Sequence, residues 1–170
     1  IGTSTSNSIT VDFGNSAISG DISVYGTNDC GDGQNSNLAI TVNPSPDEAE
    51  TITGNTTVCQ GTTLQTYTVP EIANATSYVW ALPTGATGTS TTNTIDVDFG
   101  TTAISGEISV YGTNDCGDGQ NSTLAITVNP LPDVPENITG STAVCQGATL
   151  QTYTVPEIAN ATSYVWTLPN

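Results

Sequence analysis

The sequence predicts an all-β fold, organised as tandem β-sandwich repeats of 86 residues. Three observations lead to this fold class. The chain is rich in Thr, Ser, Asn, Gly, Val and Ile, which form strands and turns. Apolar and polar residues alternate over short segments between turn signals, and no segment shows a sustained 3.6-residue period. The motif VDFG begins at Val11 and Val97, and NDCGDG begins at Asn28 and Asn114, each pair 86 positions apart.

The repeat boundaries fall at two Pro-rich acidic stretches typical of interdomain linkers, NPSPDEAE from Asn43 and NPLPDVPE from Asn129. We therefore expect the C-terminal half of a sandwich repeat at 1–44, a complete repeat at 45–130 and the N-terminal half of a repeat at 131–170. Two interpretations stay open. The chain is a window of a longer repeat protein, or residues 131–170 of one chain pair with residues 1–44 of another copy and build a filament.

Alternating patterns place the strands of the complete repeat. In TIDVDF, the apolar residues Ile95, Val97 and Phe99 face one way, and Asp96 and Asp98 face the other, close enough to repel each other. An acid–base pair would need a cleft, which so small a sandwich is not expected to offer. The expected strands are 51–58, 64–69, 77–82, 94–99, 106–111 and 122–128.

The charge pattern excludes several function classes. The chain carries 16 acidic residues and no Lys, Arg or His, for a net charge of −16. Nothing can neutralise phosphates, so nucleic-acid binding is excluded. Without His or Lys there is no triad base, His-ligated zinc or Schiff base, so we expect no enzyme activity. No apolar run approaches the ~20 residues that span a bilayer, so membrane insertion is not expected. The composition favours an exported protein.

The four cysteines suggest disulfides, which often stabilise small exported domains. Cys59 and Cys116 lie 57 positions apart in the complete repeat, and closing such a loop is worth about 4 kcal/mol. We favour this intra-repeat bond, with Cys30 and Cys145 pairing with cysteines of an adjacent repeat or chain. The alternative joins Cys30 to Cys59 and Cys116 to Cys145 across the linkers.

Each NDCGDG loop also carries two carboxylates around a glycine turn, Asp29 with Asp32 and Asp115 with Asp118. Oxygen ligands suit calcium, but two per loop are few and the spacing is not that of an EF-hand. Calcium binding and a solvated acidic turn both stay open, and no cofactor is required. The acidic linkers could supply further ligands.

Glycan attachment is a further expectation, because the chain holds five Asn-x-Ser/Thr sequons. In a repeat this rich in Thr and Asn most sequons are expected to arise by chance. The sequons are at Asn55, Asn74, Asn121, Asn137 and Asn160.

The succession of VCQG, SYVWALPTGA, a strand ending in IDVDFG, and ISVYGTNDCGDGQNSTLAITVNPLP resembles the PKD-like, immunoglobulin-type repeat of very large Bacteroidota surface proteins. The resemblance covers the whole chain in a permuted frame. It implies a two-sheet sandwich, a Cys59–Cys116 disulfide and a place at the cell surface. The implied role is structural, in an extracellular filament or adhesin stalk whose partners are copies of itself. The alternative is a calcium- or glycan-dependent binding module with a surface or glycan receptor. The chain lacks the Trp-Asp-Phe-Gly-Asp-Gly loop of the better-known PKD pattern.

Overall fold

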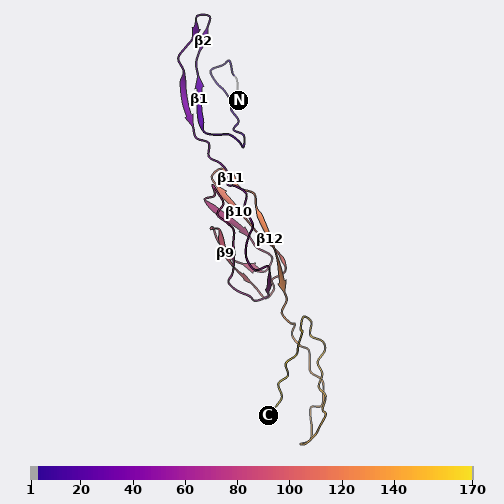
Figure 1. Ribbon diagram of the computed structural model, residues 1–170. Coiled ribbons are helices and arrows are strands. Elements are labelled where there is room, and N and C mark those ends of the chain that lie inside the picture. Colours follow the sequence, from indigo (N-terminus) through magenta and orange to yellow (C-terminus); the bar gives the residue numbers. More distant parts are fainter. Residues whose placement is uncertain (1–3, 170) are drawn as a thin grey trace.

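The computed structural model describes residues 4–169, and every regular element within them is a β-strand (Figure 1). Three parts follow one another along the molecule: an N-terminal hairpin, a central sandwich, and a C-terminal part drawn without strands. No helical segment with the length and apolar character needed to cross a bilayer occurs in the described residues.

The twelve strands define this arrangement. Their bounds are β1 Gly20–Val24, β2 Thr27–Asn28, β3 Gly31–Asp32, β4 Ser36–Ile40, β5 Thr57–Cys59, β6 Gln65–Thr68, β7 Ser77–Ala81, β8 Ala86–Thr87, β9 Thr94–Phe99, β10 Gly106–Asn114, β11 Gly117–Asp118 and β12 Ser122–Asn129.

The central part is a sandwich of two sheets. In one sheet β10 pairs with β7 and with β12, β12 pairs with β5, and β11 pairs with the end of β10. The other sheet has the order β6-β9-β8. The β5–β12 pair is parallel, and the other pairs are antiparallel. Together these strands form the all-β sandwich that the sequence predicts.

The core of the sandwich is made by the apolar positions of the alternating strands. Tyr67 and Phe99 are fully buried and meet edge to face, with ring centroids 6.5 Å apart. Trp80 is half-buried against this core and donates its indole N–H to the carbonyl of Thr92 at 2.9 Å. All buried apolar side chains come from the central part: Ala49, Ile52, Val58, Tyr67, Val69, Ile72, Ile95, Val97, Phe99, Ala103, Ile108, Val110, Ile126 and Val128.

Two strands have bounds that differ by several residues from the expected ones, because the pairing partners set where a strand begins and ends. The strand expected at 51–58 begins only at Thr57, because Thr53 in the same segment bridges to Thr68 of β6 in the other sheet. β10 runs on to Asn114, because β7 and β11 pair with its second half. The short strands β8 and β11 were not expected from the pattern.

The pairing follows a simple rule. Strands from the first half of the repeat, which holds β5, β6 and β7, pair with strands from its second half, which holds β9, β10 and β12. β5 pairs with β12, β6 with β9, and β7 with β10. Inside the first half the only pairing is an isolated bridge between Thr53 and Thr68. The second half contains its own β10–β12 pair. The first half therefore depends on the second half for its strands.

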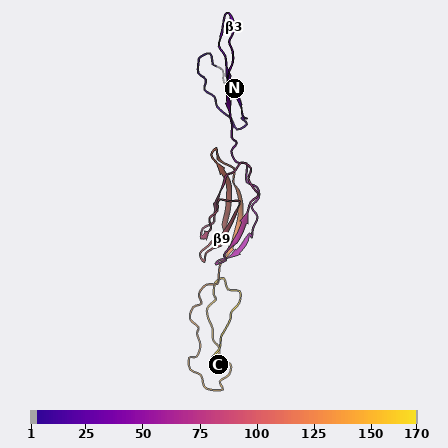
Figure 2. The same ribbon diagram turned by 90° about the vertical axis from the view of Figure 1, so that its left-hand side faces the viewer.

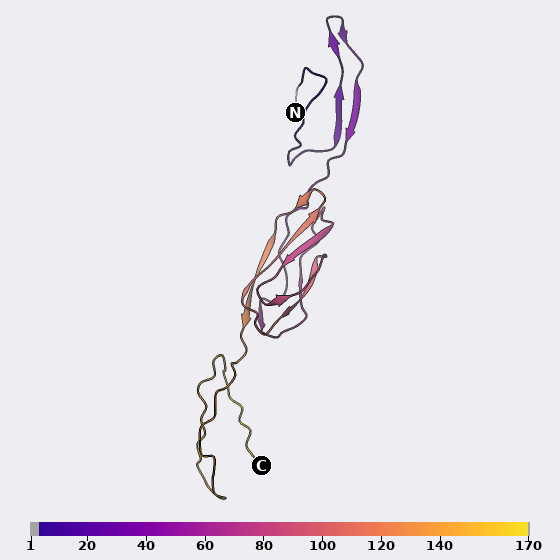
Figure 3. The same ribbon diagram turned by 180° about the vertical axis from the view of Figure 1, so that it is seen from behind.

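The two terminal parts obey the same rule. Residues 4–44 keep the hairpin β1–β4 and the corner β2–β3, which repeat the β10–β12 and β10–β11 pairs. Residues 131–169 hold only the bridge between Thr139 and Thr154, and Figures 2 and 3 show an open loop there. Yet QTYTVPEIANATSYVW is identical at 65–80 and at 151–166. The sequence of this part is therefore compatible with strands. It forms none because the second-half strands with which the equivalent segments pair in the central sandwich are not beside it.

Candidate functional site

The half repeat at residues 4–44 exposes side chains whose counterparts are buried in the core of the central sandwich. Ile9 is 46% exposed, whereas Ile95, at the same position of the repeat, is 2% exposed. Phe13 is 54% exposed, against 1% for Phe99. Ile9 also lines, with Ile22 and Val24, a groove of about 390 Å³ beside β1. This half repeat therefore presents an apolar face with no cover.

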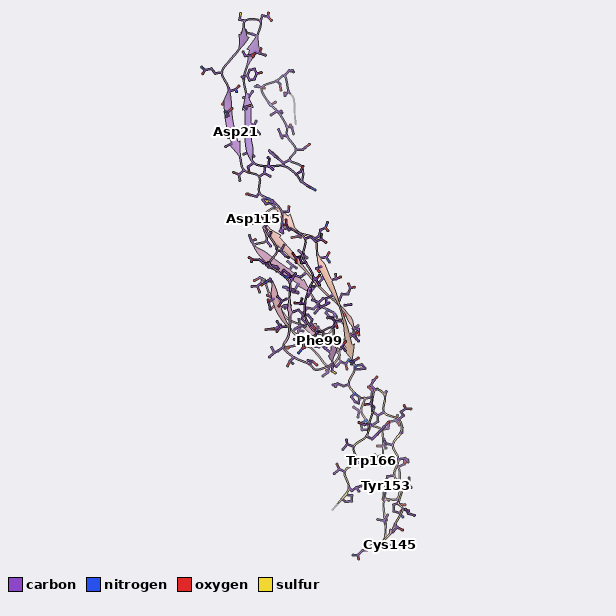
Figure 4. The ribbon with its side chains drawn as sticks, viewed as in Figure 1. Asp21, Phe99, Asp115, Cys145, Tyr153 and Trp166 are labelled. Carbon is purple, nitrogen blue, oxygen red and sulfur yellow. The ribbon has the colours of Figure 1, made fainter. Side chains whose placement is uncertain are left out.

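The half repeat at residues 131–169 exposes the complementary face. Ile138 and Tyr153 are exposed, whereas their counterparts Ile52 and Tyr67 are buried in the central core. Figure 4 labels Tyr153 and Trp166 on this part. An apolar groove of about 360 Å³ runs along it, lined by Ile138, Val155, Ile158, Tyr164 and Trp166 among others.

Not every exposed apolar residue belongs to these faces. Ile18 is 86% exposed, and Ile104, at the same position of the complete repeat, is 56% exposed. Val165 is likewise exposed, as is its counterpart Val79. These positions are exposed even where the sandwich is complete. Their exposure in the half repeats is therefore ordinary surface exposure and not loss of a cover.

Polar contacts also tie the two halves of the sandwich together. Asp98 accepts a hydrogen bond from the backbone N–H of Leu64 at 2.7 Å, and Asp96 accepts one from the hydroxyl of Thr66 at 2.6 Å. The two carboxylates on β9 thus serve to hold β6. The alternating pattern predicts only that these two carboxylates face outward and repel each other, and it carries no signal of their partners across the sheet.

The stretch beginning at Asn43 is an ordered part of the domain that follows it. The side-chain amide of Asn114 donates to the carbonyls of Pro44 at 2.9 Å and Asn74 at 2.8 Å. The N–H of Ala49 donates to the carbonyl of Gln120 at 3.0 Å, and Pro46 is buried. The first linker is therefore fastened to the β10–β12 hairpin and is not a free tether.

The four cysteines are exposed and carry free thiols. Cys116 lies at the hairpin corner, with its Sγ 3.4 Å from the carbonyl oxygen of Asn43. Cys59 lies opposite Asn129, at the far end of β12. The eight residues of β12 span roughly 24 Å between these ends. Figure 4 shows the separation through Asp115, next to Cys116, and Phe99 towards the other end.

This geometry corrects the expected Cys59–Cys116 bond. A disulfide needs Cα atoms within about 7 Å of each other, and these two thiols lie at opposite ends of one domain. The length of the loop between two cysteines does not determine where the strands place them. Cys30 and Cys145 are likewise exposed, and their expected pairing with cysteines of an adjacent repeat or chain stays a prediction.

The NDCGDG loops are tight hairpin corners. Asn114 Oδ1 accepts a 2.8 Å hydrogen bond from the N–H of Cys116, and Gly117 takes a φ of 131°, which a side chain would strain. Asp115 and Asp118 are exposed on this corner, as are Asp29 and Asp32 on the other copy. Within residues 4–169 no three acidic or thiol side chains gather closely enough to hold a metal ion. Calcium binding stays an untested expectation.

The five sequon asparagines are exposed, and their glycosylation remains a prediction. Their local roles differ. Asn55 donates its amide to Gln65 Oε1 at 2.7 Å, and Asn74 and Asn160 adopt a left-handed backbone, with φ of 64° and 63°. Asn121 and Asn137 lie on exposed loops.

Comparison with protein families identifies the fold. The family model described as "PKD-like domain" matches residues 1–40, 45–126 and 131–170. No curated protein gave a significant match. Domains of this family are typically extracellular, non-catalytic modules of immunoglobulin-like fold, which agrees with the two-sheet sandwich of the central part. The matched ranges cover almost the whole chain, and the chain belongs to the PKD-like domain family.

Proposed function

We propose that this chain is a structural module of an extracellular fibre, in which each of its half repeats is completed by the opposite half of a second copy. The observation that carries the proposal is the pairing rule of the central sandwich. Strands of the first half, β5, β6 and β7, pair with β12, β9 and β10 of the second half. Residues 131–169 repeat the first half, and residues 4–44 repeat the second.

Each terminal part lacks the strands that the other terminal part of a second copy can supply. β1 and β4 repeat β10 and β12, and therefore offer the edges on which β7 and β5 pair in the central sandwich. The C-terminal part of another copy carries the matching residues in an unpaired state. Addition of such strands satisfies backbone groups on both sides, as in other complexes that form by strand addition.

Burial of the exposed core drives the association. Covering a large apolar side chain contributes roughly 1.5–3 kcal/mol, and each half repeat exposes several that are core in the central sandwich. This gain opposes the repulsion between chains of net charge −16. The contact is head to tail and leaves a free half repeat at each end of the assembly, so it produces an open fibre and not a closed oligomer.

An extracellular setting is supported by the family and by the composition. PKD-like domains are typically extracellular. The chain has no Lys or Arg, so trypsin-like proteases find no cleavage site in it. Both features suit a structural protein exposed to the medium.

Sedimentation of the 170-residue chain in the presence of a reductant tests the proposal. We expect species that grow with protein concentration. Ile9→Asp places a charge on the face that the second copy covers, and should reduce the chain to monomers. Ile18→Asp makes the same change at a position that stays exposed in the complete repeat, and should leave assembly unchanged.

A second matched pair tests the other half repeat. Val144 is exposed, whereas its counterpart Val58 is buried; Val165 is exposed, as is its counterpart Val79. Val144→Asp should block assembly and Val165→Asp should not. A chain that sediments as a monomer at every concentration would rule the proposal out, as would equal effects of the two substitutions in each pair.

A further inference from the structure

We infer that consecutive repeats are joined by a disulfide across each linker, between the Cys59-type thiol of the preceding repeat and the Cys116-type thiol of the following repeat. The inference rests on the proposed assembly, in which a second copy brings both cysteines to one linker. It assigns the pairs Cys59 with Cys30 of the second copy, and Cys145 with Cys116 of the second copy.

The thiol of the following repeat is held against the first residue of the linker. The N–H of Cys116 donates to Asn114 Oδ1 at 2.8 Å, and its Sγ lies 3.4 Å from the carbonyl oxygen of Asn43. The side chain of Asn114 also binds the carbonyl of Pro44. The hairpin corner therefore fixes the position of this thiol relative to the linker.

The thiol of the preceding repeat lies beside the first residue of the next linker. The β5–β12 register pairs Cys59 with Asn129, and the N–H of Gln60 donates to the carbonyl of Asn129 at 2.9 Å. Paired strands lie about 4.8 Å apart, which sets the separation of the Cys59 and Asn129 backbones. Val58 and Val128 are buried, so the side chain of Cys59 points outward.

Asn43 and Asn129 occupy the same position of the repeat, 86 residues apart. The two linkers also continue alike: the N–H of Asp47 donates to the carbonyl of Ala73, and the N–H of Asp133 to that of Ala159, both at 3.0 Å. Each linker asparagine is therefore flanked by one cysteine from the domain before it and one from the domain after it. This placement suits the Cα separation of about 4.4–6.8 Å that disulfides require.

Within residues 4–169 each linker has only one of its two cysteines, Cys116 at the first and Cys59 at the second, which accounts for the free thiols. Cys30 already has the corner geometry that a bond to a second copy needs. Its N–H donates to Asn28 Oδ1 at 2.8 Å, and β2 and β3 pair in the register of the β10–β11 corner.

The bond forms by thiol–disulfide exchange with a disulfide oxidant, either a small molecule or an exported oxidoreductase. One cysteine thiolate attacks the oxidant disulfide and gives a mixed disulfide, releasing the first oxidant thiolate. The second cysteine thiolate then displaces the other half. The two protein thiols lose two protons and two electrons in total, and the oxidant disulfide is reduced to two thiols.

Natural marker residues make the pairs readable. The peptide with Cys59 carries Thr62, whereas the peptide with Cys145 carries Ala148 at the same position of the repeat. The peptide with Cys30 carries Asn37, whereas the peptide with Cys116 carries Thr123 at the same position. Chymotrypsin, which cleaves after aromatic residues and leucine, leaves each cysteine on one peptide with its marker. Digestion of chain assembled in a buffer of oxidised and reduced glutathione, without further reduction, should yield Cys59 joined to Cys30, and Cys145 joined to Cys116. Recovery of Cys59 joined to Cys116 would overturn the inference.

Two double variants give reciprocal outcomes on a non-reducing gel. Cys30→Ser with Cys59→Ser removes one inferred pair and keeps the other, so covalent multimers should persist. Cys59→Ser with Cys116→Ser removes a partner from both inferred pairs, so covalent multimers should vanish. Pairing within a repeat, Cys59 with Cys116 and Cys145 with Cys30, would give the opposite pattern.

The failure of the disulfides and the failure of the assembly are distinguishable. Sedimentation in reductant reports assembly without any covalent bond. Fibres that form but whose four thiols all react with iodoacetamide before reduction would overturn the disulfide and leave the proposed function standing. A chain that never assembles would overturn both.

Discussion

The carboxylate of Asp98 accepts a 2.7 Å hydrogen bond from the backbone N–H of Leu64, a residue with a left-handed backbone at φ 53°. A leucine in this region costs roughly 1–2 kcal/mol, and the hydrogen bond to Asp98 on β9 offsets part of that cost at Leu64. Leu150 has the same conformation, at φ 57°, although its half repeat lacks the aspartate. In the proposed assembly, Asp12 of another copy takes the place of Asp98 and accepts the hydrogen bond from the N–H of Leu150.

Asp98→Ala should lower the free energy of unfolding of the central sandwich by about 1 kcal/mol, because the N–H of Leu64 loses its acceptor. Asp98→Asn keeps an acceptor oxygen and should recover part of the loss. Urea denaturation followed by circular dichroism measures both. Asp118→Ala, on the exposed hairpin corner, is the control; equal stability of Asp98→Ala and this control would show that the contact contributes nothing.

Gly112 and Gly26 occupy the same position of the repeat and should respond differently to the same substitution. A Cβ at Gly112 would lie 2.7 Å from the Cβ of Ala75 and 3.2 Å from Ile72 Cγ2, so Gly112→Ala should destabilise the sandwich by about 1–3 kcal/mol. A Cβ at Gly26 meets nothing within 4 Å. Gly26→Ala should therefore leave the stability of a monomeric chain unchanged.

The same glycine variant also probes assembly. When a second copy covers Gly26, the new methyl group should meet the counterparts of Ala75 and Ile72, which are Ala161 and Ile158. Gly26→Ala should then weaken self-association in sedimentation by about tenfold or more, in line with the overpacking cost. Unchanged association would argue against completion of the half repeat in the geometry of the central sandwich.

Alkaline pH should destabilise the sandwich through Tyr67. Burial raises the pKa of the Tyr67 phenol above its ordinary value of 10.0. Between the pKa in the unfolded chain and the higher pKa in the folded chain, the folded state holds more protons, so the free energy of unfolding falls as pH rises above about 10. Urea midpoints measured from pH 8 to pH 11 check this expectation.

Tyr67→Phe should reduce this alkaline loss. At neutral pH the variant should be less stable by about 1 kcal/mol, because the 2.8 Å hydrogen bond from the Tyr67 hydroxyl to the carbonyl of Asn55 is removed. Tyr25→Phe, at an exposed tyrosine of the half repeat at residues 4–44, is the matched control and should keep the full alkaline dependence. Identical pH profiles for the two variants would contradict the assignment to Tyr67.

Salt should promote self-association. Chains of net charge −16 without a single basic residue repel one another, and the Debye length shortens from about 30 Å at 0.01 M salt to about 8 Å at 0.15 M. Sedimentation across this range should show larger species at the higher salt. If sodium and calcium salts at equal ionic strength act equally, simple screening accounts for the effect; a far stronger effect of calcium would point to the acidic loops.

The sequence predicted what depends on local pattern. The alternation over 94–99 located a strand whose apolar face, Ile95, Val97 and Phe99, is buried in the structure. The two-residue strands β8 and β11 are too short to produce a pattern. The hydrogen-bond partners of Asp96 and Asp98 were beyond prediction, because they depend on the register between strands far apart in sequence.

The cysteines and the C-terminal part show a second limit. The spacing of Cys59 and Cys116 determines only the length of the loop that a bond between them would close. It does not reveal that β5 pairs in parallel with β12, which places Cys59 at the opposite end of the domain from Cys116. The identical segments 65–80 and 151–166 differ in secondary structure because only the first has its partners. No method that reads local sequence could assign different states to them.

The parallel pair of β5 and β12 has a mechanical consequence. Chain enters the sandwich through the first linker and runs into β5, and leaves through β12 into the second linker, with both strands pointing along the long axis. Tension applied to the two linkers pulls these strands in opposite directions past each other. Their ladder of hydrogen bonds is then loaded in shear and must rupture together, whereas a hairpin pulled from its open end would unzip one bond at a time. Each sandwich is thus oriented to bear load along the direction in which the chain runs.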